Sequence, residues 1–248
     1  MPRTARKLSN SGYYHIVSRG NGKQILFEEE ADYLFFLKTL SECLKEESFE
    51  VIAYCLMENH FHLLLKIGSD MDRIMQKIST TYALYYNSKY ERSGHLFQDR
   101  YRSIPIENDL ALLSVVRYIH NNPVKAGICP VDKYRWSSWR AYYTGKSSQV
   151  STRLVLELTG GLNGFLTLSG QEDDVADEHR KLEDNRRLPD DHAQQIIKDI
   201  LRLESGTKIQ DMGKNDRNTA LHTLKEEGLS IRQIERLTGI SRSIIMRA

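Results

Sequence analysis

The chain lacks several features that would assign its class at once. It has three cysteines among 248 residues, and Cys43, Cys55 and Cys129 lie far apart in the sequence. Their odd number and wide spacing exclude a disulfide framework and a cysteine-based metal site, and they favour a reducing, cytoplasmic location. No run approaches the roughly 18 apolar residues of a membrane-spanning helix, and the basic start of the chain precedes no apolar stretch. We therefore expect neither membrane contact nor secretion.

An excess of charge of one sign is also absent. Thirty-five Lys and Arg oppose 33 Asp and Glu, and the resulting net charge of +2 does not by itself indicate nucleic acid. The distribution is more informative. Residues 89–140 hold nine basic and five acidic side chains, whereas residues 171–192 hold four basic and nine acidic ones. A basic segment is thus followed by an acidic one.

The pattern of apolar residues predicts an ordered series of strands and helices in the first part of the chain. Strands are predicted at 12–19, 49–57, 60–67 and 95–106, and helices at 28–47, 70–90 and 109–121. The order β-α-β-β-α-β-α is the ferredoxin-like split βαβ plan with one helix added. We therefore expect an α+β fold, in which a four-stranded antiparallel sheet carries helices on one face.

Composition and pattern divide the chain into three parts. Residues 1–145 form the predicted α+β domain, residues 146–192 a linker with a charged segment, and residues 193–248 a helical region. Residues 171–192 contain no aromatic side chain, so we expect either a mobile linker or an exposed helix there. Helices of the last part are predicted at 193–204, 219–227, 231–237 and 242–247.

Residues 219–248 have the pattern of a helix-turn-helix motif, with a short glycine-containing turn between two short helices. The last helix presents Arg242, Ser243 and Arg247. These side chains can donate hydrogen bonds to phosphates and base edges of duplex DNA. The alternative is an ordinary three-helix cap without DNA contact, because such motifs also serve protein contacts.

A pair of histidines stands in the strand predicted at 60–67. Side chains alternate between the two faces of a strand, so His60 and His62 share one face, while Phe61, Leu63 and Leu65 point into the core. Two imidazoles about 7 Å apart along a strand can bind one divalent ion. The alternative is a pair of histidines that are only hydrogen-bonded on a sheet face.

The helix predicted at 109–121 carries a second candidate. Tyr118 and Asn122 are one turn apart and share a face, and the small residues Ala111 and Ser114 leave space beside the tyrosine. A tyrosine next to a metal ion can act as a nucleophile, because a nearby cation favours the phenolate. The alternative is a packed side chain, since Tyr118 is one of thirteen tyrosines.

The strand predicted at 95–106 has a polar, basic face. Alternation places Gln98, Arg100 and Arg102 on one side and aromatic residues on the other. Such a strand suits a nucleic-acid chain, through phosphate contacts and base stacking. The alternative is a strand that simply faces solvent.

Taken in order, these segments resemble the REP-associated tyrosine transposases, which are HUH nucleases with a single catalytic tyrosine. The resemblance is carried by YHIVSRG at 14–20, NHFHLL at 59–64, GHLFQDRYR at 94–102 and RYIHNNPVKAG at 117–127. It covers about residues 1–145. Some members also carry a C-terminal helix-turn-helix like that of replication initiators, which matches residues 219–248.

The resemblance implies a mechanism. Tyr118 would attack a phosphodiester of single-stranded DNA and form a 5′-phosphotyrosine, and His60 and His62 would bind Mg²⁺ or Mn²⁺. Asn122 matches a position where relatives place a further metal ligand, and its amide oxygen suits these ions. Two imidazoles alone favour Zn²⁺, Ni²⁺ or Cu²⁺, so phosphate and water oxygens would have to complete the site. The DNA would lie along a set of polar and basic residues: Gln98, Arg100, Arg102, Arg117 and Lys125.

Three hypotheses follow. The first is a single-strand DNA endonuclease and strand transferase that acts at hairpins of repeated extragenic DNA, as a monomer or a homodimer. The second is a non-catalytic, sequence-specific DNA-binding regulator derived from a transposase, which reads duplex DNA with its helix-turn-helix. The third is an RNA-binding ferredoxin-like domain, for which exposed sheet aromatics are not evident. The joint presence of the histidine pair, Tyr118 and Asn122 favours the enzyme.

Overall fold

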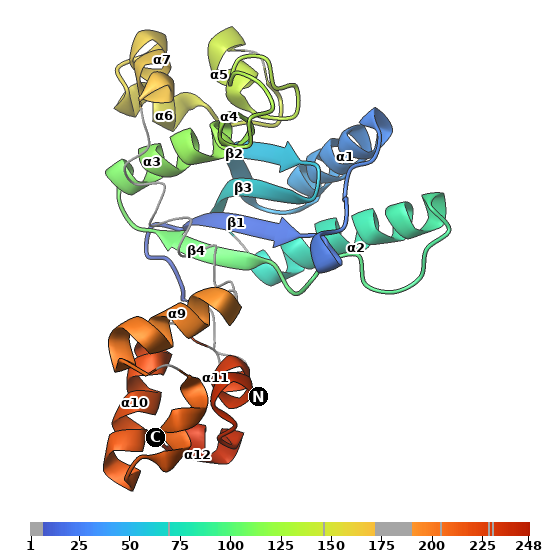
Figure 1. Ribbon diagram of the computed structural model, residues 1–248. Coiled ribbons are helices and arrows are strands. Elements are labelled where there is room, and N and C mark those ends of the chain that lie inside the picture. Colours follow the sequence, from blue (N-terminus) through green and yellow to red (C-terminus); the bar gives the residue numbers. More distant parts are fainter. Residues whose placement is uncertain are drawn as a thin grey trace. The chain divides into compact units, whose positions relative to one another are not determined.

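A computed structural model describes residues 7–68, 70–145, 147–171, 190–203, 205–227, 229 and 231–248. The chain divides into two compact units, residues 1–180 and residues 181–248. Figure 1 shows the sheet and its helices in the first unit and a group of helices in the second. Within the described ranges, no helix combines the length and apolar content needed to cross a membrane.

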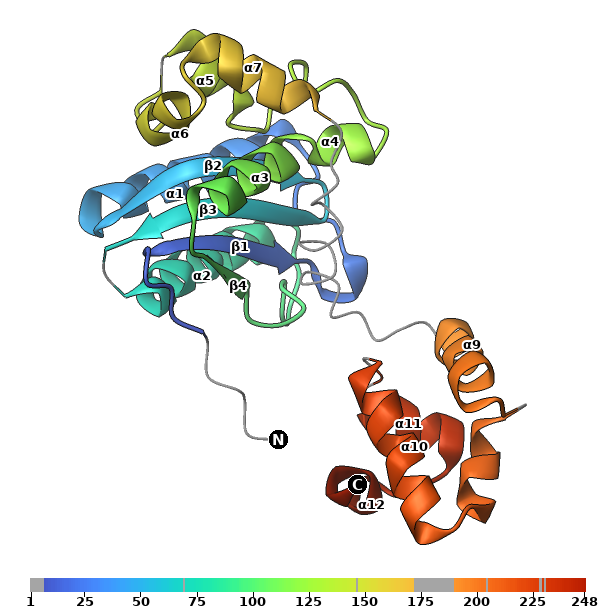
Figure 2. The same ribbon diagram turned by 90° about the vertical axis from the view of Figure 1, so that its left-hand side faces the viewer.

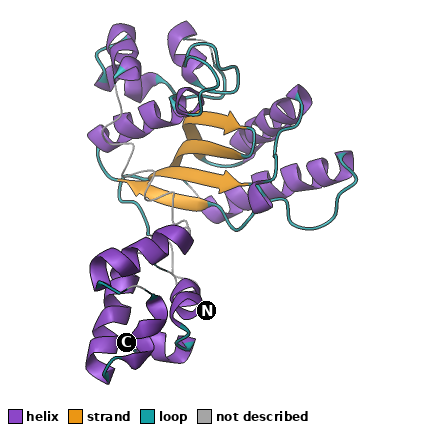
Figure 3. Cartoon of the chain, in the orientation of Figure 1, coloured by secondary structure: helices purple, strands orange, loops and turns teal. Residues whose placement is uncertain are grey.

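The first unit is built on a sheet (Figure 3) of four strands, whose order is β2-β3-β1-β4. The strands are β1 (Tyr13–Arg19), β2 (Phe49–Met57), β3 (His60–Ile67) and β4 (Arg102–Ile106). Each neighbouring pair is antiparallel. This order is that of the ferredoxin-like split βαβ plan, so the α+β fold expected from the sequence is confirmed.

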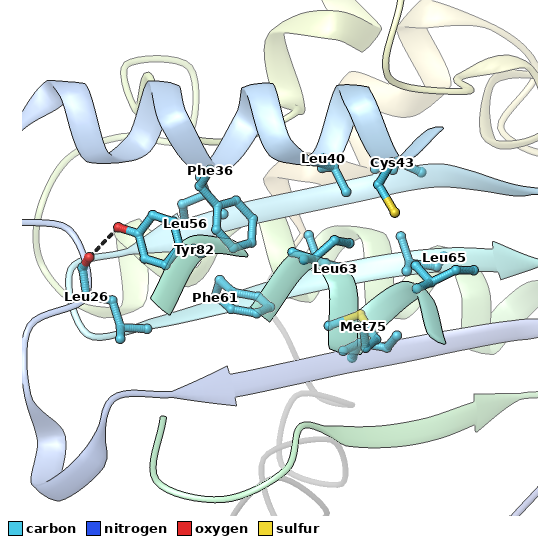
Figure 4. Packing of buried hydrophobic residues seen from close by; sticks show 14 of the residues in the cluster. Leu26, Phe36, Leu40, Cys43, Leu56, Phe61, Leu63, Leu65, Met75 and Tyr82 are labelled. Carbon is cyan, nitrogen blue, oxygen red and sulfur yellow. Dashed lines mark hydrogen bonds between the residues drawn. The ribbon is translucent and has the colours of Figure 1, made fainter. Parts of the chain in front are cut away.

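Two helices, α1 (Glu30–Glu46) and α2 (Met71–Lys89), cover one face of the sheet. Phe61, Leu63 and Leu65 of β3 are fully buried in this layer, and Figure 4 shows them beside Phe36 and Leu40 of α1. Full burial of a side chain of this size contributes about 1.5–3 kcal/mol. The alternation expected for β3 is therefore confirmed on this face.

Both helices begin at acidic side chains. Asp70 precedes α2 and accepts hydrogen bonds from the backbone N–H groups of Asp72 and Arg73, at 2.9 and 3.3 Å. Asp32, in the first turn of α1, accepts the backbone N–H groups of Glu28 and Glu29, both at 2.9 Å. These bonds satisfy N–H groups that have no partner within a helix.

The added helix lies on the opposite face of the sheet from α1 and α2 (Figure 2). Helix α3 (Asp109–His120) is followed on that face by α4 (Asn122–Lys125), α5 (Trp139–Thr144), α6 (Arg153–Leu158) and α7 (Leu162–Gly170). Leu64, between two core residues of the first face, packs in this second layer. The sheet is thus covered on both faces, whereas the sequence predicted helices on one face only.

The strand expected at 95–106 is shorter than the sequence suggested. Only Arg102–Ile106 forms β4. Residues 95–101 form a loop, in which Phe97 makes an isolated antiparallel β-bridge with Gly20. One cause is local, because the Asp99 carboxylate accepts the backbone N–H of Arg100 at 2.8 Å. Such side-chain bonds compete with strand pairing.

The prediction of a linker at residues 146–192 is also partly wrong. Helices α6 and α7 lie inside this range, and Val155 and Phe165 are fully buried in the layer that contains α3. These two helices therefore belong to the core of the first unit and do not form a linker. The remainder of the expected linker, residues 172–189, lies outside the described residues.

The second unit is helical. It contains α9 (Asp190–Leu201), the 3-10 helix η2 (Gly206–Asp211), α10 (Lys214–Glu226), α11 (Ile231–Thr238) and α12 (Arg242–Arg247). Leu221, Leu224 and Ile234 are fully buried in its core. Gly239 has φ +72° between α11 and α12, a conformation that glycine adopts without strain. Gly228 and Ser230, which stand between the helices predicted at 219–227 and 231–237, lie outside the described residues.

Candidate active site

The histidine pair lies on the face of the sheet that α3 covers. His60 and His62 project from β3 with their ring centroids 5.0 Å apart and their planes nearly perpendicular, at 83°. His62 is fully buried, and His60 is half-buried at the start of the strand. The two imidazoles are therefore close enough to bind one ion together.

Helix α3 brings Tyr118 to this pair. The Tyr118 ring meets the His62 ring edge-on, with the centroids 5.7 Å apart, and the side chain is only 5% exposed. The helix is held in this position by the apolar side chains of Leu112, Val116 and Ile119 in the second core. The structure thus brings Tyr118 on a helix to two histidines on a strand that precede it in the sequence by about 57 positions.

Asn122 lies beyond a break in the helix. Helix α3 ends at His120, and Asn122 begins the short helix α4. Its side-chain amide nitrogen donates a hydrogen bond to the Tyr118 carbonyl, at 2.9 Å. This bond uses the amide nitrogen, so the amide oxygen is the atom of Asn122 suited to a metal ion.

Helix α4 also brings Lys125 to the tyrosine. The Lys125 ammonium group lies 4.5 Å from the centroid of the Tyr118 ring. Such a cation–π contact contributes about 0.5–1 kcal/mol at an exposed position. The contact orients the ring and places a positive charge beside the candidate nucleophile.

Two further residues at the site come from β1 and were not singled out in the sequence. His15 is fully buried, and its Nε2 lies 3.2 Å from Nδ1 of His62. Arg19 pairs with His60 across the sheet, so both side chains project from the same face. Strand alternation within HIVSR at 15–19 places His15 and Arg19 on the same face of the strand. Only the register of β1 against β3 shows that this face is the one that carries the histidine pair.

The expected DNA-contacting residues separate into groups. Arg102 is exposed on β4 and paired with Val17, which in turn is paired with His62. Gln98 and Arg100 are exposed in the loop before β4, not on a strand face. Arg117 is buried and donates a hydrogen bond to the side chain of Gln171, at 3.1 Å. Arg117 is therefore engaged with the residue that follows α7.

Comparison with known proteins finds a similarity to a family over part of the chain. Residues 9–122 match the family described as IS200-like transposases, and this range contains His60, His62, Tyr118 and Asn122. This part of the chain is therefore similar to the IS200-like transposases.

The fold of the first unit agrees with a solved structure. The structure of the REP-associated tyrosine transposase bound to a REP hairpin has a TM-score of 0.52 and 18% identity, covering 58% of this chain and 86% of that chain. A candidate transposase from Deinococcus radiodurans is 19% identical, covers 48% of this chain and 96% of its own, and has a TM-score of 0.33. This second similarity is too weak to bear on the fold. No curated protein matches the chain significantly.

The side chains around the histidine pair decide which metal ion the site could hold. In the described ranges, no three His, Cys, Asp or Glu side chains are grouped so that they could hold an ion. The histidine pair therefore needs oxygen ligands of another kind. The amide oxygen of Asn122 and a phosphate oxygen of bound DNA are suitable, and with them the residues fit Mg²⁺ or Mn²⁺.

His120, in the same helix as Tyr118, has a structural role. It is buried and meets the rings of Tyr142 and Phe165 edge-on, and its Nε2 lies 2.8 Å from the Ser138 hydroxyl. Burial lowers the pKa of His120 to about 3, so the ring is neutral at physiological pH. This side chain supports the second core and does not belong to the site.

The C-terminal unit carries the other expected DNA contacts on α12. Ser243 and Arg247 are exposed. Arg242 forms an ion pair with Glu235 of α11, with 2.5 Å between Nε and Oε2. A contact from Arg242 to DNA would therefore have to compete with this ion pair.

Proposed function

We propose that the first unit, residues 1–180, is a metal-dependent endonuclease and strand transferase for single-stranded DNA, with Tyr118 as the nucleophile. The observation that carries this proposal is the position of Tyr118, whose ring contacts His62 and Lys125. The similarity of residues 9–122 to the IS200-like transposases supports the class of reaction.

The chemistry is a transesterification. The Tyr118 phenol oxygen attacks the phosphorus, a bond to this oxygen forms, and the bond from phosphorus to the 3′ oxygen breaks. The phenol loses its proton, and the departing 3′ oxygen gains one. The product is a 5′-phosphotyrosine and a free 3′-hydroxyl. Because the phosphodiester is exchanged and not hydrolysed, the strand can be rejoined without ATP.

His60, His62 and Asn122 are the proposed ligands of Mg²⁺ or Mn²⁺. The ion, when bound, neutralises charge on the transferring phosphoryl group. The protein itself supplies the position of the phenol, because α3 is fixed by its apolar face and the amide nitrogen of Asn122 bonds the Tyr118 carbonyl. Orientation of this kind lowers the barrier by removing freedom before the reaction.

The proposed substrate is a DNA hairpin with a flanking single strand. The solved relative with the same fold was bound to a REP hairpin, which supports this substrate class. Arg102 and Lys125 are exposed cations on the elements that form the site, and Gln98 and Arg100 are exposed in the adjoining loop. These four residues are the proposed phosphate contacts, whereas the burial of Arg117 argues against its inclusion.

The test is formation of the covalent adduct. Labelled hairpin oligonucleotides from the flanks of the gene are incubated with the protein and Mn²⁺, Mg²⁺ or EDTA, and products are separated on a denaturing protein gel. We expect a metal-dependent shifted band that Tyr118→Phe abolishes while hairpin binding remains. Tyr143→Phe is the matched control, because Tyr143 is 56% exposed on α5. Cleavage that survives Tyr118→Phe would refute the assignment.

A second proposal concerns the C-terminal unit. Helices α11 and α12 flank a turn at Gly239, and the exposed Ser243 and Arg247 lie on α12. This arrangement supports duplex DNA binding by a helix-turn-helix. The double substitution Ser243→Ala and Arg247→Ala should weaken duplex binding in a gel-shift assay and leave hairpin cleavage intact. Equal duplex binding by the variant would favour the three-helix cap without DNA contact.

A further inference from the structure

Both histidines of the pair are engaged through the same ring atom. Nδ1 of His60 lies 2.7 Å from the side-chain oxygen Oδ1 of Asn59. Nδ1 of His62 lies 3.2 Å from Nε2 of His15. The two partners come from different places, since Asn59 is in the turn between β2 and β3 and His15 is in the middle of β1.

The tautomer of each ring follows from these contacts. A neutral imidazole has one N–H donor and one nitrogen with a free lone pair, and only the second can bind a metal ion. The amide oxygen of Asn59 can only accept, so Nδ1 of His60 carries the proton and Nε2 has the lone pair. If His62 donates from Nδ1 to His15, its Nε2 also has the lone pair.

We infer that Asn59 and His15 are positioning residues that hold His60 and His62 in the same Nδ1–H tautomer, so that both rings offer Nε2 to one ion. The inference rests on the proposed metal site. A free imidazole in water favours the opposite tautomer, with the proton on Nε2, so the two partners reverse the intrinsic preference before any metal arrives.

The turn that carries Asn59 is held firmly. The Asn59 carbonyl accepts the backbone N–H of Gly20 at 2.9 Å. The neighbouring Glu58 carbonyl accepts the backbone N–H groups of Leu26 and Phe27, at 2.8 and 3.1 Å. These bonds fix the backbone of a two-residue turn, which keeps the short Asn59 side chain within reach of His60.

His15 is held from two sides. Its ring stacks on the His62 ring with the centroids 5.4 Å apart and an angle of 24° between the planes. It also meets the Tyr118 ring edge-on at 5.8 Å. His15 is fully buried on the central strand β1. One residue therefore contacts both a proposed ligand and the proposed nucleophile.

Partners of this kind affect metal affinity. A hydrogen bond to the second nitrogen of a metal-binding histidine fixes its ring and raises its basicity, and removing the partner commonly weakens metal binding by about 10–100-fold. Of the two histidines of the pair, replacement of Asn59 should therefore affect His60, and replacement of His15 should affect His62.

The test measures tautomers directly, in the full-length, metal-free protein. Histidine labelled with ¹⁵N is observed by long-range ¹H–¹⁵N correlation at about pH 8, above the ordinary histidine pKa of about 6.5. We expect Nδ1–H for both His60 and His62 in the wild type. Asn59→Ala should convert His60 to Nε2–H, whereas Asn59→Asp should preserve Nδ1–H because a carboxylate also accepts.

The second pair of variants addresses His62. His15→Phe should convert His62 to Nε2–H, and His15→Gln should restore Nδ1–H because an amide oxygen can accept from it. Mn²⁺ titration of the same proteins should give roughly 10–100-fold weaker binding for Asn59→Ala and His15→Phe. Asn163→Ala, at an exposed asparagine, is the matched control and should change neither measurement. If His15→Phe does not fold, the Asn59 variants at the half-buried turn still decide.

The outcomes separate this inference from the proposed function. An Nε2–H tautomer at either histidine of the wild type overturns the inference, as does unchanged Mn²⁺ affinity in Asn59→Ala. Wild-type protein that does not bind Mn²⁺ overturns both the metal site and the inference. If the tautomers and Mn²⁺ affinities respond as expected but no Tyr118 adduct forms on any hairpin, the inference stands and the nuclease proposal fails.

Discussion

At the scale of single residues, the environment of the Tyr118 ring is unusual for a buried tyrosine. Imidazole rings of His15 and His62 meet it edge-on at 5.8 and 5.7 Å, and the Lys125 ammonium group lies 4.5 Å from its centre. An ordinary core tyrosine has apolar neighbours, as Tyr82 has in the first layer. Polar and cationic neighbours are what a reacting phenol would need.

The contact of Lys125 with Tyr118 leads to a prediction about rate. Lys125→Gln removes a contact of about 0.5–1 kcal/mol, which corresponds to a roughly two- to fivefold slower reaction if the contact is realised in the transition state. The measurement is single-turnover adduct formation on a hairpin oligonucleotide in Mn²⁺. Lys133→Gln is the control, since that exposed lysine pairs with Asp132. Equal rates for both variants would contradict the prediction.

Some residues of the candidate site can be predicted from the sequence, and others cannot. His60 and His62 share a face because of strand alternation, which a sequence displays. His15 approaches His62 only because β1 pairs antiparallel with β3 in the register that sets His15 opposite Leu64. Arg117 is polar in sequence yet buried beside Gln171. Neither fact can be obtained from local pattern.

At the scale of elements, one buried carboxylate joins α1 to α2. Asp32 accepts hydrogen bonds from Lys89 at 2.6 Å, Tyr90 at 2.8 Å and Tyr85 at 3.0 Å. Burial by itself raises the pKa of Asp32, but the hydrogen bonds from Lys89, the Glu29 backbone and Tyr90 outweigh burial, and the pKa lies below its usual value. The ionised form therefore stabilises the pair of helices.

The lowered pKa of Asp32 predicts a stability that depends on pH. Its contribution is fully present above the unfolded pKa of about 3.9 and is lost as pH falls through the lower folded pKa. Asp32→Asn should lower the free energy of unfolding by about 3 kcal/mol at pH 7, because Lys89 loses its buried partner. Urea unfolding at pH 7 and at acid pH measures both effects.

The control for Asp32 is an exposed carboxylate. Glu42→Gln removes an ion pair with Lys38 whose side chains are both more than half exposed, and such pairs contribute about 0–1 kcal/mol. The stability difference between wild type and Asp32→Asn should shrink toward low pH. A difference that is the same at pH 7 and at low pH would show that Asp32 acts by packing and not by charge.

Helix α7 provides a second prediction at this scale. Phe165 is fully buried and stacks on Tyr142 with the centroids 4.5 Å apart. Phe165→Ala should lower the free energy of unfolding by about 3–5 kcal/mol, measured by urea unfolding. Leu162→Ala, in the same helix but 37% exposed, is the control and should cost much less. Similar losses for the two variants would mean that α7 is not part of the domain core.

The sequence predicted those helices and strands whose pattern of apolar residues lies within the element itself. Helices and strands with a regular apolar pattern were predicted with boundaries close to those observed. The pattern wrongly predicted a strand at residues 95–101, where the Asp99 side chain accepts a hydrogen bond from the local backbone. It also missed α6 and α7, which are short and lie in a glycine-rich part of the sequence. Short helices are stable chiefly through tertiary packing, which the sequence does not display.

At the scale of the whole molecule, the chain consists of two units with separate cores. Residues 1–180 and 181–248 form compact units, and the second has fully buried residues such as Leu221, Leu224 and Ile234 among its own helices. The family match ends at residue 122, inside the first unit. The proposed nuclease and the proposed duplex-binding motif therefore belong to different units.

This division predicts that residues 1–180 fold and cleave without the rest of the chain. The truncated protein should show cooperative urea unfolding and form the Tyr118 adduct on a hairpin at a rate within a few-fold of the full chain. Duplex binding should be lost, if it belongs to α11 and α12. Failure of the truncated protein to unfold cooperatively would show that the first unit depends on the second.

The sequence by itself determined the α+β class, the face on which His60 and His62 lie and the candidate tyrosine, because strand alternation and helical spacing are local properties. Only the tertiary structure decided the register of the strands, and with that the contact of His15 with His62 and the position of Arg19 opposite His60. It also decided the burial of Arg117, because packing of α7 on α3 brings together segments distant in sequence. Contacts between distant segments depend on register and packing, and the chain must fold before either exists.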